Sequence, residues 1–201
     1  MALTIADIGK AVLDTEYAVR GPIVARAQEL EKSGMEIIYC NIGNPQALAQ
    51  KPITWNRQLL ALCAYPDLAK EAASVFPSDA IAAAKAFISG SKHGIGAYSE
   101  SKGLKFVRDA VAAFIKNRDG IESDPDSIYL TDGASKGVQA ALRMLIAGTN
   151  DGIMVPVPQY PLYSATITMF EGRLVGYYLD EEHGWAMSRD LLEDSIETAK
   201  K

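Results

Sequence analysis

Cysteine is scarce in this sequence, which also lacks a long apolar run and an excess of basic residues. Its 201 residues include only two cysteines, Cys40 and Cys63, and neither has a histidine or another cysteine nearby. A disulfide framework is therefore not expected, and a metal site built on cysteine has no support. The ordinary interpretation is a pair of reduced, half-buried thiols in a cytoplasmic protein.

Nucleic acids, membranes and export pathways find little support in the composition. The chain carries 20 basic and 25 acidic residues, so its net charge of −5 offers no overall basic field for nucleic acid. No apolar run approaches the roughly 20 residues that cross a bilayer. The first residues lack a basic region followed by an apolar block, so a secretory signal is not expected. Asp7, Asp14 and Glu16 argue against a transit peptide.

Helices are predicted through the first half of the chain, which is long enough overall to bury a sizeable core. Residues 18–34 have a helical pattern that ends at Gly34, where a glycine commonly closes a helix. Residues 56–64 and 78–89 are predicted as two more helices. Residues 89–103, "SGSKHGIGAYSESKG", are polar and too rich in Gly and Ser for a simple turn. Long loops of this kind are often functional.

From residue 104 onward, predicted strands and helices alternate. Apolar residues recur on one helical face in "LKFVRDAVAAFIKNRDG", at Val107, Ala110, Val111, Phe114 and Ile115. The same spacing makes 135–147 an amphipathic helix, through Val138, Ala141, Leu142, Leu145 and Ile146. Short strands are predicted at 128–130, 152–157 and 173–179, and further helices at 161–170 and 189–200.

This alternation predicts an α/β fold built from βαβ units around a mostly parallel sheet, preceded by an N-terminal helical segment. Three strands and a final helix without a return strand make only part of a doubly wound sheet. Because a parallel sheet needs cover on both faces, we expect the sequence to be part of a longer protein.

One loop that leaves a predicted strand is "TDGAS". Ligands gather beyond the carboxyl ends of strands in open α/β sheets. Gly133 lets the backbone turn tightly, and the helix that begins near Ser135 directs unpaired N–H groups at one point. This pattern indicates an anion site, most naturally for a phosphate. A plain helix start capped by Asp132 or Ser135 explains the same residues. Neither this loop nor "GIGAYS" fits a Walker A or dinucleotide motif.

The second such loop is "PQYPLY", in which Pro158 and Pro161 bracket Tyr160. A residue before proline is restricted to extended geometry, so Tyr160 is expected to leave the sheet in a fixed direction. It could stack on a planar ring, which contributes about 1 kcal/mol beyond area burial. The alternative is a tyrosine packed in the core with its hydroxyl satisfied. Together, the two loops outline a site for a phosphorylated aromatic ligand.

Five segments of the sequence resemble a known family. The segments "CNIGNPQ", "YSESKGLKFVRDAVAAFI", "IYLTDGAS", "VPVPQYPLYSATI" and "YYLDEEHGWAM" are similar to the N-terminal part of the fold type I pyridoxal-phosphate aminotransferases, in particular the alanine aminotransferase branch. The similarity covers nearly the whole chain in the same order. It implies an N-terminal arm and part of the small domain over residues 1–75. Residues 76–201 would form the first part of the large domain, which binds pyridoxal 5'-phosphate.

The resemblance implies a cofactor role for both loops. The backbone of Gly133, Ala134 and Ser135, together with the Ser135 hydroxyl, would bind the cofactor phosphate. Tyr160 would stack on the pyridine ring. Tyr98 would reach the phosphate of the neighbouring subunit, so a homodimer is implied as well. The alternative for Tyr98 is an exposed loop tyrosine.

Three further residues are interpreted beside the resemblance. Gly43 would lie against the substrate carboxylate, although a simple turn glycine explains the same residue. Lys136 follows the phosphate-binding serine and lies at the wrong end of the cofactor for the lysine that forms the Schiff base. It is expected to supply charge to the phosphate or to face solvent. Arg20 is interpreted as a surface or interface residue.

The family's Schiff-base lysine, its pyridine-binding aspartate and its carboxylate-binding arginine are all expected after residue 201. The resemblance implies transfer of an amino group between L-alanine and 2-oxoglutarate, without nucleic acid or membrane partners. No catalytic residue and no metal ligand is assigned within these residues, so this chain alone is expected to be inactive. The alternatives are another fold type I enzyme, such as an aminocyclopropane-carboxylate synthase, or a non-catalytic α/β module that binds a phosphorylated ligand.

Overall fold

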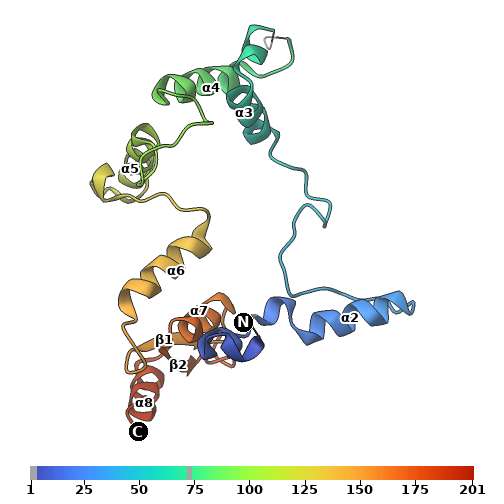
Figure 1. Cartoon of the computed structure of the whole chain (residues 1–201), viewed down its shortest axis with the longest axis vertical. Helices are drawn as coiled ribbons and strands as arrows, with labels where there is room; N and C mark the ends of the chain where they lie inside the picture. The colour runs from blue at the N-terminus through green and yellow to red at the C-terminus, as the bar shows by residue number, and fades with distance from the viewer. Residues whose placement is uncertain (1–3, 72–73) are drawn as a thin grey trace. The chain divides into compact units, whose positions relative to one another are not determined.

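The computed structural model of the chain describes residues 4–71 and 74–201. Contacts divide it into two compact units: Met1–Gly43 together with Asp132–Lys201, and Asn44–Thr131. Figure 1 labels both strands and the helices α2 to α8, and each unit is described by itself. The predicted domain boundary between residues 75 and 76 concerns the domains of the family and stays a prediction.

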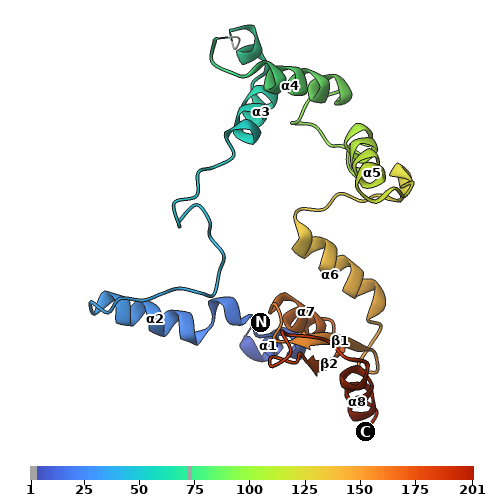
Figure 2. The same cartoon turned by 180° about the vertical axis from the view of Figure 1, so that it is seen from behind.

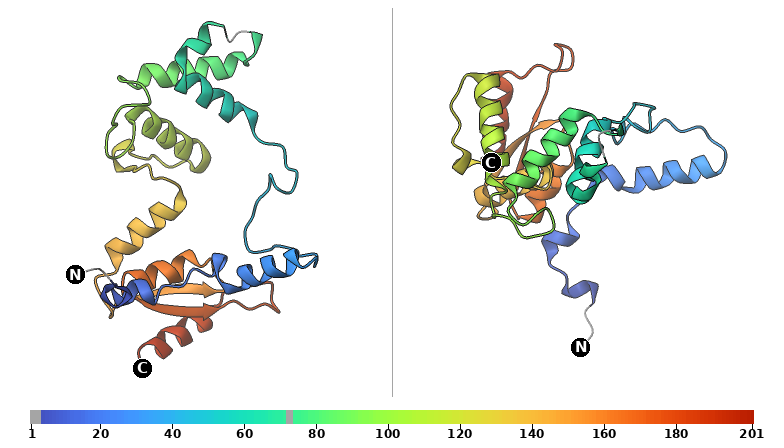
Figure 3. Two further views of the ribbon diagram at one scale, coloured as in Figure 1. Left: turned by 45° about the vertical axis from the view of Figure 1, so that its right-hand side comes forward. Right: turned by 90° about the horizontal axis from the view of Figure 1, so that it is seen from above.

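A two-stranded parallel sheet forms the centre of the first unit. β1 (Gly152–Val157) pairs with β2 (Arg173–Tyr178), and α7 (Leu162–Met169) connects them. α8 (Arg189–Ala199) follows β2 and begins at Ser188, whose side chain accepts a hydrogen bond from the Leu191 N–H. Figures 2 and 3 show α7 and α8 on opposite sides of the sheet. The predicted βαβ unit is therefore present, with its boundaries within one residue of those expected.

The core of this unit gathers where α6 (Ala134–Leu145), β1 and α7 meet. Leu142 and Ile146, at the end of α6 and just beyond it, pack with Val155 of β1 and Ile167 of α7. Burial of each such side chain stabilises the fold by about 1.5–3 kcal/mol. The apolar face predicted for residues 135–147 is therefore partly buried in the core, although Leu145 on the same face is exposed.

The N-terminal part of the first unit is helical but broken. Its elements are η1 (Ile5–Asp7), α1 (Lys10–Leu13), η2 (Ala18–Arg20) and α2 (Pro22–Lys32). The single helix predicted for residues 18–34 is interrupted at Gly21, and Pro22 then opens α2, a position that suits its fixed φ angle. α2 ends where predicted, because Gly34 has a φ of +95°.

The second unit consists of helices. Its elements are α3 (Thr54–Ala64), η3 (Pro66–Lys70), α4 (Ser78–Gly90), α5 (Lys105–Asp119) and η5 (Pro125–Ser127). α3 and α4 pack around Leu62, Cys63 and Ala84. The Phe87 ring of α4 contacts the Phe106 ring of α5 edge-on, with 5.0 Å between the centroids.

Of the predictions for residues 104–130, one was wrong and one is confirmed in part. No strand forms at residues 128–130, where the Leu130 N–H donates one hydrogen bond to the Lys102 carbonyl. A strand needs a continuing ladder with a neighbour, and β1 with β2 is the one ladder in the described part of the chain. The predicted helix forms as α5, but its apolar face is only partly covered: Val107, Val111 and Ile115 are half-buried, whereas Ala110 and Phe114 are exposed. The fully buried residues of α5 are Arg108 and Ala112.

Candidate functional site

The turn that was predicted to form an anion site opens α6. Gly133 is the N-cap of α6 and has φ +79° and ψ 163°, which a side chain at this residue would strain. No side-chain cap hydrogen bond forms at this N-cap, so the alternative of a cap by Asp132 or Ser135 finds no support. The Lys136 and Gly137 N–H groups of the first helical turn donate to the Gly133 carbonyl, at 3.2 and 3.5 Å. The N–H groups of Ala134 and Ser135 and the positive end of the helix dipole are therefore what this turn can offer to an anion.

A half-open cavity of about 480 Å³ adjoins this helix start. Its polar lining includes Ser135 and Gln139 of α6, Thr166 of α7 and Tyr17 of the N-terminal segment. Thr166 is only 3% exposed, and its hydroxyl has no hydrogen-bond partner within the described ranges. Leaving such a group unsatisfied costs roughly 1–3 kcal/mol. A cavity with an unpartnered hydroxyl beside an uncapped helix fits a phosphorylated ligand.

Tyr160 lies beyond the carboxyl end of β1 and is held by two other tyrosines. Its hydroxyl shares a hydrogen bond of 2.7 Å with the Tyr17 hydroxyl. The rings of Tyr17 and Tyr163 each meet the Tyr160 ring nearly edge-on, with 6.4 Å between centroids in both pairs. Since Tyr160 is about half exposed, it is not a core tyrosine, and its ring remains accessible to a planar ligand.

Tyr17 links the two loops that the sequence singled out separately. It lines the same cavity as Ser135, and its phenol is bonded to that of Tyr160. This hydrogen bond, followed by burial, raises the pKa of the Tyr17 phenol above its ordinary value. No local sequence pattern indicates Tyr17, because it is separated from Tyr160 by more than half of the chain.

The remaining predicted residues are placed as follows. Lys136 is exposed, and its ammonium donates to the Gln139 side chain at 3.4 Å. This geometry is compatible with a charge near the phosphate and with a lysine that faces solvent. Gly43 lies in an exposed segment where a Cβ would meet no atom within 4 Å. Tyr98 belongs to the unit Asn44–Thr131 and is fully exposed. The functional roles of all three stay predictions.

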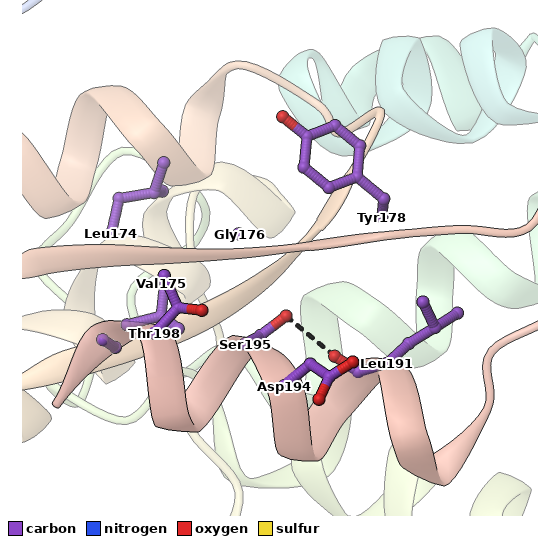
Figure 4. Close-up of a pocket in the computed structure, with 9 residues that line it drawn as sticks. Leu174, Val175, Gly176, Tyr178, Leu191, Asp194, Ser195 and Thr198 are labelled. Carbon is purple, nitrogen blue, oxygen red and sulfur yellow. Dashed lines mark hydrogen bonds between the residues drawn. The ribbon is translucent and has the colours of Figure 1, made fainter. Parts of the chain in front are cut away.

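Another hollow of about 340 Å³ lies between β2 and α8. In Figure 4, Val175 is on the side of β2 that faces α8, and Tyr178 is on the opposite side. The Ser195 hydroxyl donates to the Leu191 carbonyl of its own helix at 2.8 Å. Beside apolar side chains, this hollow is lined by a single carboxylate, that of Asp194, and by the hydroxyls of Tyr178, Ser195 and Thr198.

Metals and membranes receive no structural support in the described residues. Residues 4–71 and 74–201 contain no group of three His, Cys, Asp or Glu side chains that could hold a metal ion. Nor does any helix within those ranges combine the length and apolar character needed to cross a membrane. Cys40 is exposed and Cys63 is buried, and both are free thiols.

Comparison with known proteins identifies the class. Alanine aminotransferase from Pyrococcus furiosus, a solved structure, matches 93% of this chain with a TM-score of 0.69 and 26% identity, over 40% of its own length. The α/β fold is thus that of the fold type I aminotransferases, as predicted. The sequence model described as "Aminotransferase class I and II" matches residues 60–201, and this chain belongs to that family. Pyridoxal 5'-phosphate is the cofactor of the family.

Two curated relatives show how much of such an enzyme the chain covers. It is 50% identical over 201 residues to glutamate–glyoxylate aminotransferase 2 of Arabidopsis thaliana, covering 99% of this chain and 42% of that protein. It is 47% identical over 214 residues to alanine aminotransferase 2 of Panicum miliaceum, covering 100% of this chain and 44% of that protein. The chain therefore spans about two-fifths of the length of these relatives.

Proposed function

We propose that this chain forms the phosphate- and ring-binding part of an aminotransferase that exchanges an amino group between L-alanine and 2-oxoglutarate. The proposal includes a homodimer, a cytoplasmic location and small-molecule substrates. It is supported by family membership and by the similarity to proteins named alanine aminotransferase. The structural observation that carries it is the uncapped start of α6 beside the cavity lined by Ser135 and Thr166.

Each residue of the site has a defined task in this proposal. The N–H groups of Gly133, Ala134 and Ser135 surround the cofactor phosphate, and the Ser135 hydroxyl donates a further hydrogen bond to it. Tyr160 lies against the pyridine ring, and Tyr17 fixes the Tyr160 hydroxyl at 2.7 Å. When bound, pyridoxal phosphate supplies an electron sink for charge that develops at the substrate Cα.

Two residues complete the proposed site, one of them from a second subunit. Tyr98 reaches the phosphate held by the neighbouring subunit, and Gly43 leaves room for the substrate carboxylate. Lys136 contributes positive charge near the phosphate or faces solvent, and it is not the lysine that reacts with the cofactor. No residue of this chain is assigned to proton transfer.

A titration of the chain with pyridoxal 5'-phosphate tests the phosphate site. Ser135→Ala is expected to weaken binding by about 1–3 kcal/mol, as for the loss of a charge-assisted hydrogen bond. Ser195→Ala is the matched control, because its hydroxyl bonds to its own helix at Leu191. Pyridoxal, which lacks the phosphate, should bind both variants equally. Unchanged affinity of Ser135→Ala for the phosphorylated form would contradict the assignment.

A second candidate function is transfer between glutamate and glyoxylate. It is favoured by the 50% identity to a protein named glutamate–glyoxylate aminotransferase. Initial rates of the intact natural protein, measured with each amino donor and each 2-oxo acid in turn, distinguish the two activities. Another fold type I enzyme would give neither activity, and a non-catalytic module would not respond to pyridoxal phosphate at all.

A further inference from the structure

Arg108 of α5 is a buried charge for which the proposed function has no use. Its side chain is only 3% exposed, yet all of its bonding groups have acceptors nearby. Nε donates to the Gly103 carbonyl at 2.9 Å, and Nη1 donates to the Pro125 carbonyl at 2.7 Å. Nη1 also donates to Asp126 at 3.0 Å, and Nη2 donates to Glu100 at 2.7 Å.

These acceptors belong to the two segments that flank α5 in the chain. Glu100 and Gly103 lie in the polar loop before α5, while Pro125 and Asp126 lie in η5 after it. A guanidinium is suited to this arrangement because its five donors are fixed in one plane. A lysine presents three donors from a single point and could not reach all four acceptors together. Arg108 therefore fastens both segments to the same helix.

The segment held by Glu100 carries Tyr98 two residues earlier. Two residues of extended chain span at most about 7 Å, so fixing Glu100 confines Tyr98 to a small region. The Gly103 N–H also donates to the Glu100 carbonyl at 2.8 Å, which closes a turn at the same point. Upstream, the Ser91 hydroxyl donates to the Gly94 carbonyl at 2.9 Å. Between these two anchors, Tyr98 is fully exposed.

We propose that Arg108 is a positioning residue that, through Glu100 and Gly103, holds the loop in the shape that presents Tyr98 to a cofactor phosphate. The proposal rests on the proposed function, because it takes the role of Tyr98 from there. It adds a reason why a charged residue occupies the buried face of α5. It also predicts that Arg108 and Glu100 influence phosphate binding without touching the phosphate.

The test compares the affinities of pyridoxal 5'-phosphate and pyridoxal for variants of the full chain. Tyr98→Phe is expected to weaken binding of the phosphorylated form about tenfold, with no effect on pyridoxal. Glu100→Gln, whose side chain is 59% exposed and so is expected to fold, should weaken binding of the phosphorylated form several-fold. The double variant Tyr98→Phe/Glu100→Gln should bind pyridoxal 5'-phosphate as tightly as Tyr98→Phe alone, because Glu100 acts through Tyr98.

Two further variants separate positioning from general damage. Arg108→Lys keeps the charge but is expected to reproduce the loss seen in Glu100→Gln. Glu122→Gln removes a different carboxylate that pairs with α5, at Lys116, and should leave affinity unchanged. Tryptic cleavage after Lys102 gives a readout independent of the cofactor. It should become faster in Glu100→Gln and Arg108→Lys and remain unchanged in Glu122→Gln.

The outcomes distinguish failure of the proposed function from failure of the positioning role of Arg108. If the unchanged chain does not bind pyridoxal 5'-phosphate, or if Tyr98→Phe binds it normally, the proposed function fails and the positioning role fails with it. If Tyr98→Phe weakens binding but Glu100→Gln does not, or if the two losses simply multiply, the positioning role alone is overturned. Faster tryptic cleavage of Glu100→Gln with unchanged affinity for pyridoxal 5'-phosphate would also overturn the positioning role. Loosening the loop would then have no effect on phosphate binding.

Discussion

The phenol oxygens of Tyr17 and Tyr160 lie 2.7 Å apart, although 142 residues separate them in the chain. Their shared hydrogen bond raises the pKa of Tyr17, because ionisation of that phenol would remove the proton that one hydroxyl gives to the other. The N-terminal segment is therefore tied to the loop that follows β1.

Tyr160→Phe is expected to bring the pKa of Tyr17 back toward its ordinary value of 10.0. Absorbance near 295 nm, followed during an alkaline titration, measures phenolate formation. A difference curve between the unchanged chain and the variant should show a tyrosine that ionises at higher pH only when Tyr160 is present. Tyr163→Phe serves as the control, since Tyr163 contacts Tyr160 through its ring alone. If the Tyr160→Phe curve differed from that of the chain only by the loss of one ordinary tyrosine, as expected for Tyr163→Phe, the bond would be refuted.

Gly103→Ala is expected to destabilise the unit Asn44–Thr131 by about 2–4 kcal/mol, through backbone strain and overpacking together. Gly103 has a φ of +97°, and a Cβ there would lie 2.5 Å from the Leu130 side chain. Gly120→Ala is the matched control, because its φ is +72° but no atom lies within 4 Å of its Cβ. Strain alone should cost about 1–2 kcal/mol in that variant. Equal urea midpoints for the two variants would exclude the close contact with Leu130.

Acid is expected to loosen the segment held by Asp126. The hydrogen bond from Arg108 lowers the pKa of the Asp126 carboxyl below its ordinary value of 3.8, with Lys102 and Lys105 adding weaker attraction. Because the folded pKa is the lower one, this contribution to stability is complete above pH 3.8 and is lost as the pH falls through the folded value.

Urea unfolding between pH 5 and pH 2.5 measures this loss. Asp126→Asn should be less stable at pH 5 and should show a shallower decline in acid than the unchanged chain. Asp67→Asn, which removes an exposed ion pair with Lys70 in the same unit, should decline as steeply as the unchanged chain. An Asp126→Asn curve parallel to that of the unchanged chain would mean that Asp126 has no such role.

The two thiols are expected to react at very different rates. Cys40 is exposed, whereas Cys63 is 5% exposed and packs with Leu62 and Ala84. Burial also raises the pKa of the Cys63 thiol, which lowers its thiolate fraction. In Cys40→Ser, labelling by a thiol reagent should therefore be slow and should accelerate with urea as α3 and α4 separate. Rapid labelling of that variant without urea would contradict the packing.

The sequence predicted the elements from residue 152 onward closely, because each has a strong local signal. The apolar run 152–157 acts within a few residues, as does Gly34 at the end of α2. Residues 128–130 failed because an isolated apolar triplet does not reveal whether a neighbouring strand will pair with it. The burial of Arg108 was not predicted either, since a helical apolar pattern gives no reason to expect a buried charge.

In the candidate site, too, residues with a local sequence signal were predicted and residues defined by tertiary contacts were not. Gly133 and Tyr160 could be selected from local chemistry, since one needs a positive φ and the other stands between two prolines. Tyr17 and Thr166 could not, because their importance depends on contacts and burial that only the folded chain creates. Roles for Tyr98 and Gly43 were taken from family resemblance, and they remain predictions.

Each compact unit happens to contain one of the two tryptophans, Trp55 in Asn44–Thr131 and Trp185 in the other. The Trp55 indole donates to Asp79 at 3.0 Å, which ties α3 to α4 and makes its emission sensitive to that contact. Replacing either indole by phenylalanine leaves a chain with a single intrinsic fluorophore. Coincident melting curves from two such chains would reveal one cooperative transition, whereas separate midpoints would reveal halves that lose their structure independently.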